Sequence, residues 1–310
     1  MMLDNGFVIN APKHLLPSYR ISPFRTIDIY KNRSIQGGGE IGIEKYLSNR
    51  FECRKILLTD SGRSALDASL VALGLKADDV VTIFTTTNKF YISGCVTDQI
   101  EKYCKWSRKI EKNTKAILVN HEFGYCSQEM KSYASLGYPI IEDFAHSFAS
   151  DSINNDAGYY GDFLIFSFSK YFPIQIGGAL VYSNKFNIKN KEGSGFESYV
   201  RNTVSDCIDL IPSIKLKKLE NYKYYSEQFL KLNLKSYFKL EKNDCPGVFC
   251  FKINNDIDLN KMKNFINSQG IESSIFYGEK AYFLPCHQNM NKQDIDYIYT
   301  VVKYFLEVNL

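Results

Sequence analysis

Residues 163–182 read FLIFSFSKYFPIQIGGALVY and contain two apolar runs on either side of a lysine. The first run ends at Phe168 and is typical of a buried strand, and Lys170 lies just beyond it. Gly177 and Gly178 then open the second run. A lysine at the edge of a buried sheet can lose its proton and attack a carbonyl group. A solvated loop charge is the common alternative, so the interpretation depends on the rest of the chain.

Short apolar segments alternate with helical patterns from Lys55 onward. The segment RSALDASLVALGL carries leucines at helical spacing, whereas the apolar segments have the length of buried strands. This alternation predicts an α/β fold, with a mostly parallel sheet covered by helices and ligands bound at the carboxyl ends of its strands. The predicted strands cover residues 56–59, 80–84, 116–119 and 138–141, and the predicted helices cover residues 63–75 and 89–99.

The pattern changes after about residue 190 and predicts a smaller α+β unit. Its expected elements are a helix over residues 213–232, a strand over 248–253, a helix over 259–268, a strand over 271–276 and a C-terminal helix with Ile295, Ile298, Val302 and Phe305 on one face. At the other end, three prolines before residue 24 are typical of an arm. We therefore predict an arm over residues 1–35, a large domain over 36–190 and a small domain over 191–310.

The composition is that of a soluble globular protein, with 310 residues and a net charge of +4. The basic segments RKIEKNTK and KLKKLENYKYY are better explained as solvated faces than as a nucleic-acid groove, which needs a concentrated basic stripe. The eight cysteines form no CxxC pair and favour reduced thiols, and the four histidines lack metal-ligand spacing. We expect a cytoplasmic protein with neither a membrane nor a nucleic-acid partner, because the sequence shows no signal-peptide or membrane-span pattern.

An anion site is predicted where Ser61, Gly62 and Arg63 lie between a strand and the start of a helix. The free N–H groups of a helix N-terminus bind phosphate well, and Gly62 lets an anion approach the backbone. An ordinary N-cap by Ser61 is the alternative.

A carboxylate, Asp143, is predicted at the end of the strand that contains Ile140 and Ile141. A buried carboxylate needs a cationic or N–H partner, and a protonated pyridine nitrogen would serve. A capping aspartate or a structural salt bridge is the alternative. Glu142 points to the opposite side of a strand and is not expected in the same site.

One motif is interpreted as a coincidence. Residues 37–42, GGGEIG, fit the spacing of a dinucleotide-binding loop. The preceding segment IYKNRSIQ is not a buried strand, and no βαβ unit begins there. We therefore predict no dinucleotide site in this segment.

With an anion site, an aspartate and a lysine in that order, the chain resembles the DegT-type nucleotide-sugar aminotransferases, which are fold-type-I pyridoxal phosphate enzymes. The resemblance extends from about Gly37 to the C-terminus. The segments that carry it are SGRSALDASLVALGL, His121-Glu122-Phe123-Gly124, IIEDFAH, Gly161-Asp162, FSFSK with Gly177-Gly178, and FLPCHQNMNKQDIDYI.

The resemblance implies pyridoxal 5'-phosphate as the cofactor and Lys170 as the residue to which it is covalently attached. It implies that Asp143 pairs with the pyridine nitrogen and that His146 lies near the ring hydroxyl. The catalytic residues would then be Lys170, Asp143 and His146. The further cofactor contacts that it implies are Ser61, Gly62, Arg63, Asn88 and Ser167.

The implied reaction is amino transfer in two stages, from an amino acid, expected to be glutamate, to a nucleotide-linked keto sugar for a surface polysaccharide. Lys170 would move the proton during both stages. The resemblance also implies a homodimer with its sites at the subunit interface.

The chain departs from the family pattern at several positions. Arg63 replaces the usual threonine, and Asn88 replaces the aromatic residue that stacks on the cofactor ring, a role that Phe90 could take. A connecting segment after Trp106 and an Asn-x-Arg-Met stretch before the long helix are missing. These segments help to bind substrate in the family.

Other functions therefore stay open. One is a pyridoxal phosphate enzyme that acts on a small non-sugar keto compound or catalyses dehydration, although Lys170 argues against the dehydratases, which tend to carry histidine there. Another is a non-catalytic family member that binds ligand. The last is a plain nucleotide-binding α/β protein, in which Lys170 and Asp143 would lie far apart.

Overall fold

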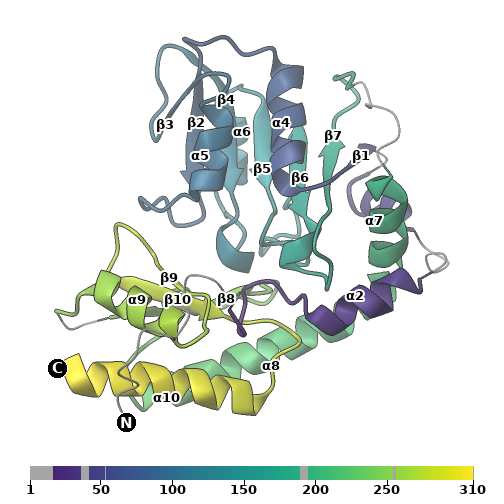
Figure 1. Ribbon diagram of the computed structural model, residues 1–310. Coiled ribbons are helices and arrows are strands. Elements are labelled where there is room, and N and C mark those ends of the chain that lie inside the picture. Colours follow the sequence, from purple (N-terminus) through teal and green to yellow (C-terminus); the bar gives the residue numbers. More distant parts are fainter. Residues whose placement is uncertain (1–16, 36–41, 53, 189–194, 254–255, 310) are drawn as a thin grey trace, which may run out of the picture.

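The computed structural model describes residues 17–35, 42–52, 54–188, 195–253 and 256–309. Its main layer is a seven-stranded sheet with the strand order β1-β7-β6-β5-β4-β2-β3 (Figure 1). The four strands predicted before residue 150 are confirmed as β1, β2, β4 and β5. The strands of the sheet are β1 (Lys55–Thr59), β2 (Val80–Thr85), β3 (Lys105–Ser107), β4 (Thr114–Asn120), β5 (Ile140–Asp143), β6 (Phe163–Ser167) and β7 (Gly178–Tyr182).

The pairing confirms a mostly parallel sheet. Strands β3, β2, β4, β5 and β6 run parallel, and β7 is inserted antiparallel between β6 and β1. The register sets Asn120 beside Asp143. It also sets Ser167 beside Gly178, which pairs in turn with Thr59. The polar residues at the ends of these strands therefore meet at one edge of the sheet.

Helices cover both faces of this sheet, as the α/β prediction requires. Along β6, Ile165 belongs to the core under α4 and α5, whereas Leu164 and Phe166 belong to the core shared with α3 and α7. Successive side chains of a strand point to opposite faces, so both faces are buried. The covering helices are α3 (Ile43–Arg50), α4 (Gly62–Leu73), α5 (Gly94–Ile100), α6 (Met130–Ala134) and α7 (Phe196–Ser205).

The ends of α4 follow from local sequence. The Ser61 side chain accepts a hydrogen bond from the backbone N–H of Ser64, which caps the first turn. Gly74 ends the helix with a φ of +62°, a left-handed conformation that glycine adopts without strain. The helix predicted over residues 89–99 is only partly confirmed. It begins at Gly94, because the Ser93 side chain accepts a hydrogen bond from Cys95 N–H and caps the helix there.

The smaller unit contains a three-stranded antiparallel sheet in the order β8-β10-β9, with helices α8 and α10 beneath it in Figure 1. The predicted helices and first strand are confirmed, whereas the strand expected over residues 271–276 contains only two residues. Strand β10 was not predicted. The elements are α8 (Ile211–Leu230), β8 (Val248–Lys252), α9 (Leu259–Ser268), β9 (Ser274–Ile275), β10 (Ala281–Pro285) and α10 (Lys292–Asn309).

The predicted arm contains a helix that sequence periodicity did not indicate. Helix α2 (Thr26–Arg33) is anchored by Asn32, whose side-chain amide donates to the carbonyl oxygen of Pro173. Residues 1–16 lie outside the described part, as does most of the GGGEIG segment. The three-part domain division stays a prediction, and α7 shares its apolar core with the large sheet.

One basic segment does not form a fully solvated face. In α8, Lys218 is only 1% exposed, and its ammonium group lies 4.7 Å from the ring centroid of Tyr171. Leu216, two residues earlier in the same helix, is 60% exposed. The favourable interaction between the ammonium group and the ring face allows Lys218 to take a buried position.

Candidate active site

A cavity of about 470 Å³ lies at the carboxyl ends of the strands, between the large sheet and β10. Its walls come from the start of α4, the segment before α5, the ends of β4, β5 and β6, and Phe283 of β10. Seven of the eight cofactor contacts expected from the sequence line it, namely Ser61, Gly62, Arg63, Asp143, His146, Ser167 and Lys170. Residues separated by more than one hundred positions therefore meet in one place.

Lys170 ends a short 3-10 turn, η2 (Phe168–Lys170), that directly follows β6. Backbone hydrogen bonds hold this turn in place, because Phe168 N–H donates to the carbonyl oxygen of Gly177 and Gly177 N–H donates to that of Asp60. Gly177 has a φ of +119°, which an L-residue rarely adopts. The glycine pair thus closes the loop that brings Lys170 into the cavity.

Asp143 lines the cavity and is 5% exposed. Its carboxylate accepts hydrogen bonds from the Asn120 side-chain amide at 2.8 Å and from Ala145 N–H at 2.9 Å. Burial raises the pKa of Asp143, and these two donors and the charge of Lys170 oppose that rise. The carboxylate has no cationic side chain within ion-pair distance among the described residues, so it can take a cation from a ligand.

His146 lines the same cavity three residues later. Burial holds the pKa of His146 well below its usual range, and the charges of Lys170 and Lys218 act in the same direction. Its ring packs edge-on against Phe123 at 5.3 Å. A neutral imidazole at this position can donate or accept a hydrogen bond without carrying charge.

The predicted anion site lies where α4 begins against β6 and β7. The N–H groups of Gly62 and Arg63 precede the first intrahelical bond, in which Ala65 N–H donates to the Ser61 carbonyl oxygen. The exposed Arg63 guanidinium forms no ion pair with any described residue. This set of free donors suits a phosphate group. Ser61 also caps the helix, so the predicted alternative describes part of its role.

Gly178 lets the backbones at this site approach one another. A Cβ atom built on Gly178 would lie 2.6 Å from the Phe166 carbonyl oxygen and 2.9 Å from Gly62 N. Both contacts are with backbone atoms, which cannot move without displacing the anion site.

Gly178→Ala is therefore expected to lower the unfolding free energy by about 2 kcal/mol and to weaken pyridoxal phosphate binding about tenfold or more. Chemical denaturation and absorbance titration would measure the two effects. Gly195→Ala is the matched control, because a Cβ there meets nothing within 4 Å. Equal behaviour of the two variants would contradict the assigned role of Gly178.

Asn88, the eighth expected contact, does not line the cavity. It lies in a turn with a φ of +52°, where its Oδ1 accepts from Thr85 N–H and its Nδ2 donates to the Tyr133 hydroxyl at 2.7 Å. Phe90 is 72% exposed and also lies outside the lining. Tyr91 lines the cavity instead and packs against Phe276 with ring centroids 5.0 Å apart. The aromatic surface therefore comes from a residue that the sequence analysis did not single out.

Glu142 lies on the opposite side of β5 from Asp143, as expected. It is fully buried, its Oε2 lies 3.0 Å from His121 Nε2, and it accepts hydrogen bonds from the N–H groups of Gly158 and Gly161. Ser127 N–H donates to His121 Nδ1, so His121 carries its proton on Nε2 and donates to Glu142. The His121 motif therefore stabilises the loops beneath the site.

Sequence reasoning missed Asn120 and Glu122 as cavity residues. Asn120 ends β4, so the rule that placed Asp143 at the end of β5 could have found it. Glu122 is 2% exposed, and its Oε2 accepts a hydrogen bond from Thr87 N–H at 2.7 Å. Its Oε1 is buried without a hydrogen-bond partner. Burial raises the pKa of Glu122 to about 7, although the Thr87 hydrogen bonds and the charge of Arg108 oppose the rise.

Glu122→Gln is expected to gain about 2 kcal/mol of stability relative to wild type when the pH rises from 5 to 8. The folded protein holds the Glu122 proton up to about pH 7, whereas the unfolded chain releases it near pH 4.5. Wild-type stability therefore falls as the pH rises through this window, and the variant lacks that loss. Urea unfolding at both pH values measures the difference. A constant difference would show that Glu122 titrates normally.

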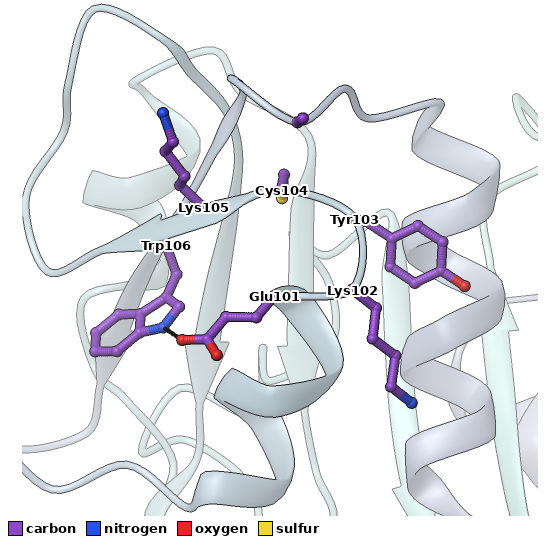
Figure 2. Close-up of a pocket in the computed structure, with 7 residues that line it drawn as sticks. Glu101, Lys102, Tyr103, Cys104, Lys105 and Trp106 are labelled. Atoms are coloured by element: carbon purple, nitrogen blue, oxygen red, sulfur yellow. Dashed lines mark hydrogen bonds between the residues drawn. The ribbon is translucent and has the colours of Figure 1, made fainter.

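A second hollow lies at the far edge of the sheet, beside β3 (Figure 2). It shares no lining residue with the cavity. Figure 2 shows Trp106 and Glu101 joined there by a hydrogen bond of 2.8 Å from the indole N–H to the carboxylate. Its residues show no grouping of nucleophile, base and anion donors, so we place no chemistry in it.

Comparison with known proteins identifies a related family over part of the chain. Residues 99–191 match the sequence profile described as the DegT/DnrJ/EryC1/StrS aminotransferase family. The resemblance to this family is confirmed. The matched residues include Asp143, His146, Ser167 and Lys170.

Two curated relatives are sugar aminotransferases. The chain is 29% identical over 177 residues to a UDP-4-amino-4,6-dideoxy-N-acetyl-beta-L-altrosamine transaminase of Campylobacter jejuni, a match that covers 50% of this chain and 46% of the relative. It is 26% identical over 279 residues to a 3-oxo-glucose-6-phosphate:glutamate aminotransferase of Bacillus subtilis, with coverages of 76% and 62%. The matches thus span about half and about three fifths of these relatives.

Solved structures confirm the fold. A protein of Streptococcus pneumoniae described as a sugar aminotransferase, in its PLP form, matches with a TM-score of 0.71 and 16% identity over 95% of this chain and 98% of that chain. The GDP-4-keto-6-deoxy-D-mannose-3-dehydratase of E. coli matches with a TM-score of 0.67 and 15% identity over 93% and 100%. The large sheet and the small α+β unit therefore form the type I fold of PLP-dependent transferases.

All seven cysteines in the described ranges are free, and all but Cys95 are buried. Within the same ranges, none of the helices is both long and apolar enough to cross a membrane.

Proposed function

We propose that this chain is a pyridoxal phosphate-dependent aminotransferase that moves an amino group from an amino acid, glutamate, to a nucleotide-linked keto sugar. The observation that supports it most directly is the meeting of Lys170, Asp143 and the α4 anion site in one cavity. A plain nucleotide-binding protein would have no reason to place a lysine and a buried carboxylate together. Both groups line this cavity, and the charge of Lys170 opposes the rise in the pKa of Asp143 that burial causes.

The residues present fit the cofactor. The Gly62 and Arg63 N–H groups, the Arg63 guanidinium and the Ser167 hydroxyl would hold its phosphate, and Ser61 would keep the helix start in place. Gly62 lies close against Ser167, with only 3.1 Å from a built Cβ to the Ser167 Cβ. Asp143 would bind the ring nitrogen and His146 the ring hydroxyl.

Pyridoxal phosphate, when bound, supplies an aldehyde for the amino group and a ring that withdraws electrons. Lys170 would bind it covalently and, once released, would take the proton from the α-carbon of the amino acid at Nζ and deliver it to the carbon of the former aldehyde. Asp143 would keep the ring nitrogen protonated, because a buried carboxylate stabilises a cation beside it. Neutral His146 would orient the ring without adding charge to the site.

We propose that the acceptor of the amino group is a sugar. It is supported by the two curated relatives, whose names specify sugar substrates, one of them nucleotide-linked. A surface-polysaccharide pathway would use such a product. We place the reaction in the cytoplasm, which the free thiols of the described residues support.

Absorption spectroscopy with added pyridoxal phosphate tests the proposal. A yellow species that borohydride traps on Lys170, and that glutamate bleaches before the trap is applied, would support the amino-transfer half-reaction. Peptide mass mapping locates the attachment. Absence of both changes in a folded protein would refute the aminotransferase and favour a ligand-binding role.

We further propose a homodimer. Exposed apolar side chains on α2 and directly before α8 support it, with Tyr30 at 75%, Ile27 at 54% and Leu210 at 51% exposure. Sedimentation velocity would show a species of twice the 35.6 kDa chain mass. A monomer at micromolar concentration would refute this part of the proposal alone.

A further inference from the structure

Glu122 is the buried ionisable residue of the cavity for which the proposed amino transfer has no use. One carboxylate oxygen is fixed by Thr87 N–H, and the other is buried without a hydrogen-bond partner. The Thr85 hydroxyl, from the end of β2, is also buried without a partner of normal geometry. An unpaired buried carboxylate oxygen is costly, so it is kept where a ligand supplies the missing donor.

The Thr85 and Thr87 hydroxyl groups lower the pKa of Glu122, but neither forms a hydrogen bond with the second carboxylate oxygen in the described structure. The negative charge of Glu122 affects the pKa values of four neighbouring groups. They are Arg108 in the loop after β3, Tyr91 before α5, Cys250 in β8 and Tyr237 in the loop before β8. Arg108 is the one cation among them, and no ion pair within 4 Å joins it to Glu122 in the described structure. The carboxylate is therefore free to accept from a ligand.

The wall that holds Glu122 also presents aromatic surface. Tyr91, Phe123 and Phe283 line the cavity together, with the rings of Phe123 and Phe283 only 4.8 Å apart. Aromatic faces pack against the C–H faces of a sugar ring, while carboxylates accept its hydroxyl groups. An apolar wall with one buried acceptor thus matches a polyhydroxylated ring better than an aliphatic keto acid.

We infer that Glu122 is a specificity-determining residue that accepts a hydrogen bond from a hydroxyl group of the bound sugar, against the aromatic wall of Tyr91, Phe123 and Phe283. This inference rests on the proposed sugar substrate and assigns the residue that recognises it. The carboxylate form is the stronger acceptor on both oxygens, so a sugar hydroxyl that donates to Glu122 favours loss of its proton. Binding should therefore strengthen as the pH rises.

Isothermal titration calorimetry of the protein loaded with pyridoxamine phosphate tests the inference. The probes are UDP-N-acetylglucosamine and glucose 6-phosphate, which lack a keto group and cannot react. Wild type should bind one of them more tightly at pH 8 than at pH 6, and should release protons on binding at pH 6.5. Glu122→Gln should bind about 10- to 100-fold more weakly at pH 8. It should show neither the pH dependence nor the proton release.

Glu111→Gln is the matched control, because Glu111 is exposed in the loop between β3 and β4. Equal affinity of Glu122→Gln and wild type, or no binding of either probe to wild type, would overturn the inference. The glutamate reaction of wild type is measured separately. A wild type that binds sugar through Glu122 but does not react with glutamate would retain the inference and lose the aminotransferase.

Discussion

Replacement of Lys170 by alanine is expected to abolish covalent attachment of pyridoxal phosphate and to slow amino transfer by at least about 10³-fold. The lysine ends the η2 turn that follows the carboxyl end of β6, and no other lysine lines the cavity among the described residues. Its side chain is partly exposed and forms no ion pair in that part of the chain. The fold should therefore tolerate the change, with an unfolding free energy within about 0.5 kcal/mol of wild type.

Borohydride trapping followed by peptide mapping, and single-turnover kinetics with glutamate, would measure these effects. Lys185→Ala is the matched control, since Lys185 follows β7 on the surface and, among the described residues, forms its one ion pair with Asp162. A reduced cofactor adduct recovered from Lys170→Ala would show that the cofactor is attached to a residue other than Lys170. Loss of folding in the same variant would instead show that Lys170 has a structural role.

The large sheet could be predicted from the sequence because its strands are buried on both faces and form short continuous apolar runs. That pattern located β1, β2, β4, β5 and β6, and the strand-end rule then brought Asp143 and Lys170 to one edge. Helix α2 gave no such signal. It is attached through Asn32, while Ile27 and Ile29 of the same helix are about half exposed. Apolar periodicity does not mark a helix held by polar contacts.

The part of the site that the sequence did not reveal depends on contacts between distant segments. Tyr91 lies in an irregular stretch and is turned into the cavity by packing against Phe276 and Phe283 of the small unit. Asn88 faces away because the turn uses its side chain for Thr85 and Tyr133. The orientation of a loop side chain follows from its tertiary partners, which are not encoded by local periodicity.

The burial of Lys218 could likewise not be predicted from the local sequence. Its neighbours in KLKKLENYKYY predict a solvated helical face, yet it is almost completely buried over the Tyr171 ring. Tyr171 comes from the loop that follows Lys170, nearly fifty positions earlier in the chain. A cation on an aromatic face is stabilised only when the fold brings the two together, so composition alone assigned the wrong environment.

Asp143→Asn is expected to slow amino transfer by about 10² to 10³-fold while leaving the fold and the oligomeric state unchanged. Asparagine is nearly isosteric and its oxygen can still accept from Ala145 N–H, which now bonds Asp143 Oδ1. The asparagine amide is neutral, so it cannot stabilise the positive charge of a protonated ring nitrogen. The loss should therefore fall on kcat rather than on the amount of folded protein.

Stopped-flow measurement of the glutamate half-reaction gives the rate, and sedimentation velocity gives the oligomeric state. Asp98→Asn on the exposed side of α5 controls for loss of one negative charge. In Asp143→Asn the Asn120 amide, which donates to Asp143 Oδ2 in wild type, would face the new amide group. Adding Asn120→Asp to Asp143→Asn places the carboxylate on the neighbouring strand β4 instead of β5. Partial recovery of rate in that double variant would show that charge at this strand edge is what the reaction needs. Unchanged turnover in Asp143→Asn would mean that the ring nitrogen takes its partner from elsewhere in the cavity.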